Sequence, residues 1–376
     1  MMAQDIFLGL LKAGLWQKAL PALDAPLSKE EWRGVFDLAV KQSLDGIIYD
    51  GMMMLPEEQR PDRILQLKWH GRVNKTEQMH HILNHALVEA VDRLEKEGIP
   101  ALLLKGQGNA SFYENPLRRQ CGDIDLLIGR KNYERACRLM ISWGMSHVQE
   151  SVKHLDGEWL GTHVELHRIA AQMDNPIGQR RLVGWSEALL ADRSHMFVPT
   201  FETHAVAIPQ PDFNVFFVFF HLLHHFASVG IGLRQFCDLA RLLHVYHGQL
   251  DLCELSRRIE SFGLMRQWQV VGCLLVHSIG LPQEECPFYK DTRQKSEMIL
   301  RMVIHEGNFG LYSKEQRGRR YTSYLGRKCE TLLISTKRHA RLMGISPGWA
   351  TRSYLSFVFR GTVAAIKGLV IQENEK

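Results

Sequence analysis

Two aspartates separated by one residue, Asp123 and Asp125, are the feature of the sequence that most directly suggests chemistry. They lie in residues 122–129, GDIDLLIG, where an apolar run between two glycines predicts a short buried strand. Alternate side chains of a strand point to the same side, so the two carboxylates should converge. Unpaired like charges at such a place are costly, and a divalent cation removes the conflict. Mg²⁺ suits such a site because it prefers carboxylate oxygens and keeps water and substrate phosphates in its shell.

A third acidic residue, Glu165, lies in the segment HVELH, residues 163–167, which belongs to another predicted strand. Three carboxylates that hold two Mg²⁺ (or Mn²⁺) ions are suited to in-line phosphoryl or nucleotidyl transfer, because the ions stabilise the attacking and leaving oxygens. We therefore expect Asp123, Asp125 and Glu165 to be both metal ligands and catalytic residues. The alternative for an isolated Asp-x-Asp pair is a strand end with two solvated acids. The flanking Gly122, the apolar strand and an upstream Lys-Gly turn favour the metal site here.

The upstream Lys-Gly turn predicts a binding site for the phosphates of a nucleotide. Lys105 and Gly106 end the apolar run ALLL, residues 101–104, which predicts a buried strand. Gly106 lets the backbone approach a phosphate closely, Lys105 offers a charge, and Gly108 leads into a helix N-terminus suited to anions.

Two arginines, Arg118 and Arg119, precede the acidic strand. A guanidinium group can hold a phosphate through two parallel hydrogen bonds, so either arginine is a candidate phosphate ligand. The alternative is that one or both are surface charges.

The histidines around Glu165 leave several roles open. His163 and His167 flank it on one face of the predicted strand. A zinc site is the less favoured hypothesis, because the order H-x-E-x-H differs from the H-E-x-x-H of helical zinc proteases. We expect hydrogen bonding to the acids, from His167 more than His163, or plain packing.

Further polar residues lie in an apolar, Phe-rich helix predicted at 212–228 and in the helix after it. The histidines of the first helix are predicted to be satisfied core or surface residues, with His224 and Asp238 as weaker candidates to line a cleft. Arg234 and Asp238 are one helical turn apart, so they could simply pair with each other. The basic cluster Arg317, Arg319 and Arg320 is predicted to be a solvated face, so nucleic-acid binding is not specifically indicated.

The elements that position these residues divide the chain into four regions. Residues 1–98 and 311–376 are predicted to be helical, as are residues 171–310, which would line a cleft. Residues 99–170 combine short strands with one helix and predict a small mixed sheet. Its predicted strands are 101–104, 122–129, 147–153 and 159–167, and its helix is 131–143.

With these motifs the chain resembles the uncharacterised nucleotidyltransferase family of the DNA polymerase beta superfamily. The resemblance covers roughly residues 30–310 and is carried by LLLKG, YENP, the arginine pair, GDIDLLI and VELH. It implies an α+β fold whose small mixed-sheet nucleotidyltransferase core is flanked by helical regions. It assigns the triphosphate turn to Lys105 and Gly106, the metal pair to Asp123 and Asp125, and the third acid to Glu165. The chain departs from the superfamily pattern in having Lys-Gly where Gly-Ser is usual and Glu where Asp is commoner.

The resemblance implies Mg²⁺-dependent transfer of a nucleoside monophosphate from an NTP to an acceptor, which is a small molecule, a protein or RNA. A toxin-like transferase that modifies protein or RNA differs only in the acceptor. A nucleotide-binding protein that lost catalysis is the rival of another class, and the intact acids argue against it.

Composition limits the setting of this chemistry. The chain has 376 residues, and its 46 basic and 41 acidic residues give a mild formal charge of +5, which allows an anionic ligand. Its seven cysteines form no CxxC pair, and the N-terminal residues lack the features of a secretion signal, so we expect reduced cysteines and a cytoplasmic location. The most apolar run, residues 213–226, is too short and too polar to span a membrane.

Overall fold

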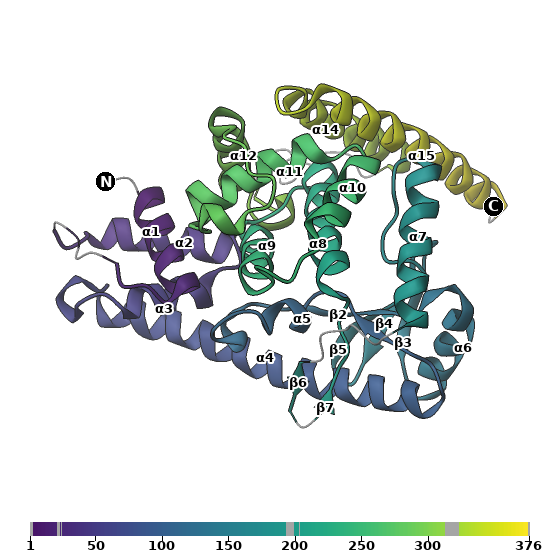
Figure 1. Ribbon diagram of the computed structural model, residues 1–376, viewed down its shortest axis with the longest axis horizontal. Coiled ribbons are helices and arrows are strands. Elements are labelled where there is room, and N and C mark those ends of the chain that lie inside the picture. The colour runs from purple at the N-terminus through teal and green to yellow at the C-terminus, as the bar shows by residue number, and fades with distance from the viewer. Residues whose placement is uncertain are drawn as a thin grey trace.

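The computed structural model describes residues 3–20, 23, 25–192, 199–202, 204–312 and 323–374. A mixed five-stranded sheet lies at one end of the molecule and is surrounded by helices, and this α+β arrangement confirms the predicted fold class (Figure 1). The predicted basic cluster Arg317, Arg319 and Arg320 lies outside the described residues.

The sheet has the strand order β1-β2-β5-β4-β3. Its strands are β1 (Leu102–Leu103), β2 (Asp123–Leu127), β3 (Ser146–Glu150), β4 (His154–Trp159) and β5 (Thr162–His167). Strands β2 and β5 are parallel, whereas the other neighbours are antiparallel. Ile124 and Leu126 of β2, with Val164 and Leu166 of β5, are fully buried. Because side chains alternate along a strand, the residues between them are presented on the opposite face. A two-stranded ribbon of β6 (Thr200–Phe201) and β7 (His204–Ala205) lies apart.

A long helix, α4 (Arg63–Lys96), runs beneath the sheet and contacts β2 and β5 (Figure 1). Its buried residues Leu83, Leu87, Val91 and Leu94 recur at helical spacing, so one stripe of the helix is apolar. The residue before the helix, Asp62, is its N-cap, and its side chain accepts a hydrogen bond from the Leu65 N–H. The remaining helices near the two ends of α4 are α1 (Ala3–Trp16), α2 (Lys29–Lys41), α3 (Asp45–Met53) and α6 (Gly129–Ser142).

The second half of the chain is mostly helical and lies over the opposite side of the sheet from α4 (Figure 1). Its helices are α7 (Pro176–Ala191), α8 (Pro211–Ser228), α9 (Leu233–Val245), α10 (Leu252–Ser261), α11 (Met265–Leu274) and α12 (Arg293–Glu306). Helix α8 confirms the helix predicted at 212–228, and it buries most of the Phe-rich run. None of the helices described by the structure is both long enough and apolar enough to cross a membrane.

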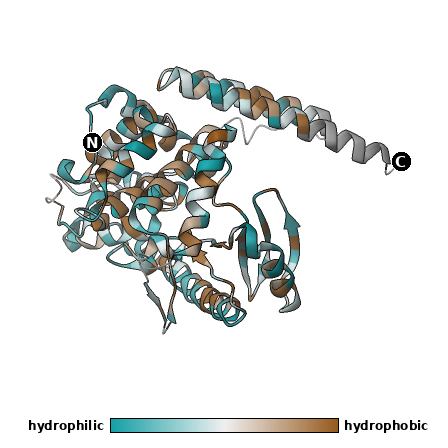
Figure 2. Cartoon of the chain, turned by 45° about the vertical axis from the view of Figure 1, so that its right-hand side comes forward, coloured by the Kyte–Doolittle hydropathy of each residue, from teal (hydrophilic) through white to brown (hydrophobic). Residues whose placement is uncertain are grey.

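The last two helices, α14 (Tyr324–Met343) and α15 (Pro347–Asn374), pack against each other. Figure 2 shows them as a pair along one edge of the molecule, away from the sheet. They contact the rest of the protein mainly through α8, so they are remote from the acidic residues of β2 and β5.

The predicted strands at 147–153 and 159–167 are wrong in their boundaries. The structure has three strands there, because β4 begins at His154 and a tight turn at Leu160 and Gly161 joins it to β5. Both turn residues have positive φ, +48° and +75°, which suits the right-handed twist of a hairpin. Leu160 at the turn is apolar and follows Trp159 directly, so these residues were predicted as part of a strand and the hairpin was missed.

Candidate active site

The three acidic residues come together on the face of the sheet opposite to the apolar core of β2 and β5. The parallel register places Asp123 opposite His163 and Asp125 opposite Glu165. One carboxylate oxygen from each of Asp123, Asp125 and Glu165 lies within 4.8 Å of the other two. The pairing of β2 with β5 is therefore what joins residues that are 40 positions apart in the sequence.

The oxygen atoms of this cluster fit a hard divalent cation. Asp125 is fully buried, yet its Oδ2 atom has no hydrogen-bond partner among the described residues. A buried oxygen left unpaired costs free energy, and a bound cation would remove that cost. Carboxylate oxygens are also the donors that Mg²⁺ and Mn²⁺ prefer.

The carboxylates of the cluster differ in their acid strength. The Asp125 charge and burial raise the pKa of Asp123. Burial alone would raise the pKa of Asp125, but the Lys105 ammonium and His167 outweigh it and hold that pKa below its ordinary value. Burial likewise opposes ionisation of Glu165, yet the neighbouring His154 and His167 imidazoles keep its pKa low. Asp123 is therefore the acid that most lacks a cationic partner.

Two histidines hold the acids in place from β4 and β5. His167, fully buried, bonds through Nε2 to Asp125 Oδ1 at 2.9 Å, and the same nitrogen lies 3.1 Å from Glu165 Oε2. His154 Nδ1 lies 3.0 Å from that Glu165 oxygen. His163, expected to contribute less, is 44% exposed, and its Nε2 atom lies 3.9 Å from Asp156 rather than at the acids.

His154 was not found from the sequence. It belongs to β4, and the antiparallel pairing of β4 with β5 sets it opposite His167. A prediction of the turn at Leu160 and Gly161 would have found it, because that turn pairs β4 with β5 and so brings His154 next to the strand that carries Glu165.

Lys105 lies within the acidic cluster. Its Nζ atom lies 2.9 Å from Asp125 Oδ1 and 3.4 Å from Nε2 of His221 on α8. Burial would lower the pKa of Lys105, but Asp125, Asp123 and Glu165 raise it, so the ammonium remains charged. Burial and this ammonium lower the pKa of His221 well below its usual range, which leaves a neutral imidazole next to the lysine.

The adjoining Gly106 has a structural requirement of its own. Its φ is +55°, and an added Cβ atom would lie 2.9 Å from the carbonyl oxygen of Asp123. A side chain at this position would therefore push the turn away from β2. The helix that follows, α5 (Gln107–Ala110), has only four residues, so the predicted helix N-terminus belongs to a single turn.

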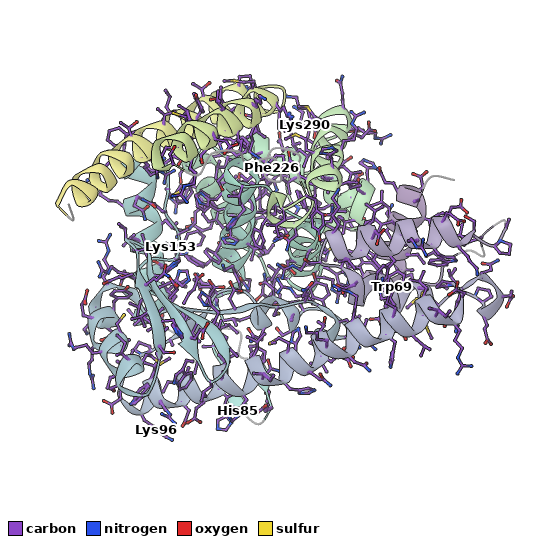
Figure 3. All side chains as sticks on the ribbon, turned by 180° about the vertical axis from the view of Figure 1, so that it is seen from behind. Trp69, His85, Lys96, Lys153, Phe226 and Lys290 are labelled. Atoms are coloured by element: carbon purple, nitrogen blue, oxygen red, sulfur yellow. The ribbon has the colours of Figure 1, made fainter. Side chains whose placement is uncertain are left out.

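A polar pocket opens between the acids and the helical region. Its lining includes Lys105, Arg119, Asp123, Asp125 and, from the helices, His221, Arg234 and Phe309. Lys153, labelled in Figure 3, lies near the same junction of the sheet and helices. The pocket thus places several cations beside the carboxylates, which suits an anionic ligand that also binds metal.

The two candidate arginines separate in space. Arg118 pairs with Asp50 of α3 and Glu77 of α4 at 3.1 and 2.9 Å, and it does not line the pocket. Arg119 lines the pocket, but its guanidinium group is bound by Asp238 of α9 at 3.0 and 2.5 Å.

Asp238 also accepts a hydrogen bond from the Tyr113 hydroxyl at 2.7 Å. The idea that Asp238 pairs with Arg234 is therefore wrong. Arg234 instead donates to the carbonyl oxygen of Gln120 and lines the pocket. His224, a weaker candidate for the cleft, is not among the lining residues, whereas Asp238 is.

The Arg119–Asp238 pair should stabilise the junction between the sheet and α9. Both side chains are at most 5% exposed, and the pair lowers the pKa of Asp238 despite its burial. Replacing Asp238 by Asn should lower the free energy of unfolding by about 3–5 kcal/mol, because it leaves a buried guanidinium unpaired. Urea denaturation measures this change. Asp50→Asn is the control, since Arg118 keeps Glu77, and an equal loss in both variants would contradict the special role of the buried pair.

A comparison with known protein families decides the classification. Residues 28–279 match the model of the family described as uncharacterised nucleotidyltransferase. The chain belongs to this family. The match includes all three acids and the residues that line the pocket as far as Asp238, so the nucleotidyltransferase family assignment covers the whole site except Phe309. No curated protein and no solved structure shows significant similarity to the chain.

Proposed function

We propose that the protein transfers a nucleoside monophosphate from an NTP to an acceptor hydroxyl, with Mg²⁺ or Mn²⁺ held by Asp123, Asp125 and Glu165. The observation that carries the proposal is the meeting of these carboxylates on β2 and β5, within 4.8 Å of one another. The family assignment supports transferase chemistry in general. When bound, the divalent ions would polarise the phosphate and stabilise charge on the attacking and leaving oxygens.

The reaction has a simple atomic balance. The acceptor oxygen forms a bond to the α-phosphorus, the bond from that phosphorus to the bridging oxygen breaks, and pyrophosphate leaves. Burial alone would raise the pKa of Glu165, but His154 and His167 hold that pKa low, so this carboxylate is a weak base. We therefore assign Glu165 to metal binding and positioning, and the proton of the acceptor passes to solvent.

The cations of the pocket would bind the triphosphate. Lys105 and Arg234 are the candidates, because both line the pocket. Lys105 contacts Asp125, one of the proposed metal ligands, so its ammonium group lies where a metal-bound phosphate would lie. Arg234 donates to the carbonyl oxygen of Gln120, and its Nε atom has no hydrogen-bond partner among the described residues. Arg119 is held by Asp238, so we assign it to shaping the pocket wall rather than to direct binding.

The direct test is to incubate the pure full-length protein with each α-³²P-labelled NTP, Mg²⁺ or Mn²⁺, and a cell extract. The Asp123→Asn/Asp125→Asn double variant is the control. Label that moves only with wild-type protein supports the proposal, and its destination separates a small molecule from protein or RNA. Growth inhibition on overexpression, abolished in the double variant, would favour a toxin-like transferase. NTP binding without any transfer would favour a non-catalytic nucleotide-binding protein.

Replacing Lys105 by Ala should raise the apparent KM for NTP about tenfold or more, since a lost charged contact to phosphate is worth about 1.4 kcal/mol or more. Steady-state kinetics at saturating acceptor measure the change. Arg118→Ala is the comparison variant, because Arg118 pairs with Asp50 and Glu77 outside the pocket. An unchanged KM for Lys105→Ala would remove Lys105 from the phosphate site.

A further inference from the structure

A second group of metal-ligating side chains lies in the helical region, apart from the acidic cluster. One ligand atom from each of Cys273, His277 and Asp291 lies within 4.8 Å of the other two. Cys273 Sγ and Asp291 Oδ1 are 3.9 Å apart. Tetrahedral zinc bonds of about 2.3 Å to sulfur and about 2.0 Å to oxygen place such atoms roughly 3.5 Å apart, so only a small adjustment is needed.

The local fold brings these residues together. Cys273 lies near the end of α11, and His277 follows it in a π-helical turn, Leu275–Ile279, where the sequence pattern predicts a continuous helix. The carbonyl oxygen of His277 accepts a hydrogen bond from Lys12 of α1 at 2.9 Å, which fixes the turn. Asp291 comes from the segment just before α12, which packs against α11. Single π turns inside helices occur frequently at functional sites.

The sulfur atom of Cys273 is buried and accepts a backbone hydrogen bond. The Thr292 N–H donates to it at 3.4 Å, and the Ser296 hydroxyl oxygen lies 3.5 Å away while it donates to the carbonyl oxygen of Arg293 at 2.9 Å. A backbone donor of this kind favours a thiolate and is typical of the groups that orient metal ligands. His277 is partly exposed and Asp291 is exposed, so an ion could reach the sulfur from solvent.

We propose that Cys273, His277 and Asp291 bind a zinc-type divalent metal ion, with one coordination position left to water. A thiolate, an imidazole and a carboxylate together select a borderline-soft cation such as Zn²⁺ rather than Mg²⁺. The ion would tie α11 to the start of α12, a connection that is independent of the proposed transferase site. Figure 3 shows the separation, since Lys290, next to Asp291, lies far from Lys153 near the sheet.

A competing cation lies at the mouth of this site. Arg293 Nη2 is 3.4 Å from Asp291 Oδ2 and 3.4 Å from His277 Nε2, but its side chain is 57% exposed and free to swing outward. The Tyr289 hydroxyl also lies 3.0 Å from His277 Nε2. A metal ion must displace the guanidinium group, so removing Arg293 should strengthen binding.

The test uses Co²⁺ as a spectroscopic substitute for Zn²⁺ in the full chain. Cobalt bound to Cys273 should produce a sulfur-to-cobalt charge-transfer band in the near ultraviolet, which cobalt at the acidic cluster cannot produce. Titration should show saturation near one ion per chain, and Zn²⁺ should abolish the band. His277→Gln and Asp291→Asn should each weaken binding at least tenfold, and Cys273→Ser should remove the band. Arg293→Ala should tighten binding several-fold.

Two controls separate this site from other ligands. Cys253 and Cys329 are the exposed cysteines, so the Cys253→Ser/Cys329→Ser variant should keep the band. The Asp123→Asn/Asp125→Asn variant should also keep it. Retention of the band in both His277→Gln and Asp291→Asn, or its loss with the exposed cysteines, would overturn the proposal. Far-ultraviolet circular dichroism checks that each variant is folded, and the partly exposed His277 and Asp291 make their variants informative even if Cys273→Ser unfolds.

Discussion

Replacing Asp123 by Asn should reduce nucleotidyl transfer about a thousandfold or more without lowering the free energy of unfolding. In the proposed function Asp123 binds a divalent ion. Loss of such a carboxylate removes several kcal/mol of transition-state stabilisation, and each 1.36 kcal/mol is about a factor of ten in rate. Transfer of label from α-³²P-NTP measures the first effect, and urea denaturation in the absence of divalent ions measures the second.

The expected effect on stability follows from the surroundings of Asp123. Its carboxylate makes no hydrogen bond or ion pair with the described part of the chain, and the Asp125 charge and burial raise its pKa. A raised carboxyl pKa means that ionisation destabilises the folded state, so stability falls as pH rises through the unfolded and then the folded pKa. Asparagine mimics the neutral acid and should leave stability at neutral pH unchanged or higher.

The matched control is Asp156→Asn on β4. Asp156 faces Glu165 across the β4–β5 pairing, but it is not one of the three acids that share a possible ion. This variant should keep transfer within a few-fold of wild type. Unfolding of Asp123→Asn would show that Asp123 is structural, and wild-type transfer by this variant would remove it from the metal site.

Replacing Glu165 by Gln should also reduce transfer about a hundredfold to a thousandfold, but here the protein should become less stable. Glu165 lies 3.0 Å from His154 Nδ1 and 3.1 Å from His167 Nε2, and despite burial these imidazoles depress its pKa. A depressed carboxyl pKa contributes stability that is present above the unfolded pKa and is lost on acidification. Glutamine removes that contribution, so urea denaturation near neutral pH should show a lower midpoint.

Glu165→Asp provides the comparison for chain length. Aspartate keeps the charge but is shorter by one methylene, so it should retain more transfer than Gln while reaching the histidines less well. Wild-type rates in Glu165→Gln would refute the third-acid assignment. If Glu165→Gln and Asp123→Asn changed stability in the same direction, the contrasting electrostatics of the two acids would be wrong.

The residues of β2 and β5 show how much of the site could be predicted. The apolar run of GDIDLLI between glycines identifies a buried strand, and the period of two places Asp123 and Asp125 on one face. VELH is likewise recognisable as a strand, so the sequence also identifies Glu165 as a candidate partner. These are local properties of the backbone, and they need no knowledge of distant contacts.

The partners of these acids could not be predicted in the same way. His154 becomes a neighbour of Glu165 only because a hairpin folds β4 against β5, and the apolar Leu160 at that turn made the segment look like continuous strand. Arg118 and Arg119 are adjacent in the sequence, yet one points to Asp50 and Glu77 and the other to Asp238. Which side chain meets which charge depends on how α3, α4 and α9 pack around the chain.

The sequence by itself therefore determined the fold class and the strand that carries the acidic pair. Only the tertiary structure decided that Lys105 pairs with Asp125, that Arg119 pairs with Asp238, and that Arg234 lines the pocket. The physical reason is range. Hydrophobic periodicity and strand geometry act over neighbouring residues, whereas ion pairs form between whatever charges the packing of distant elements brings within a few ångströms.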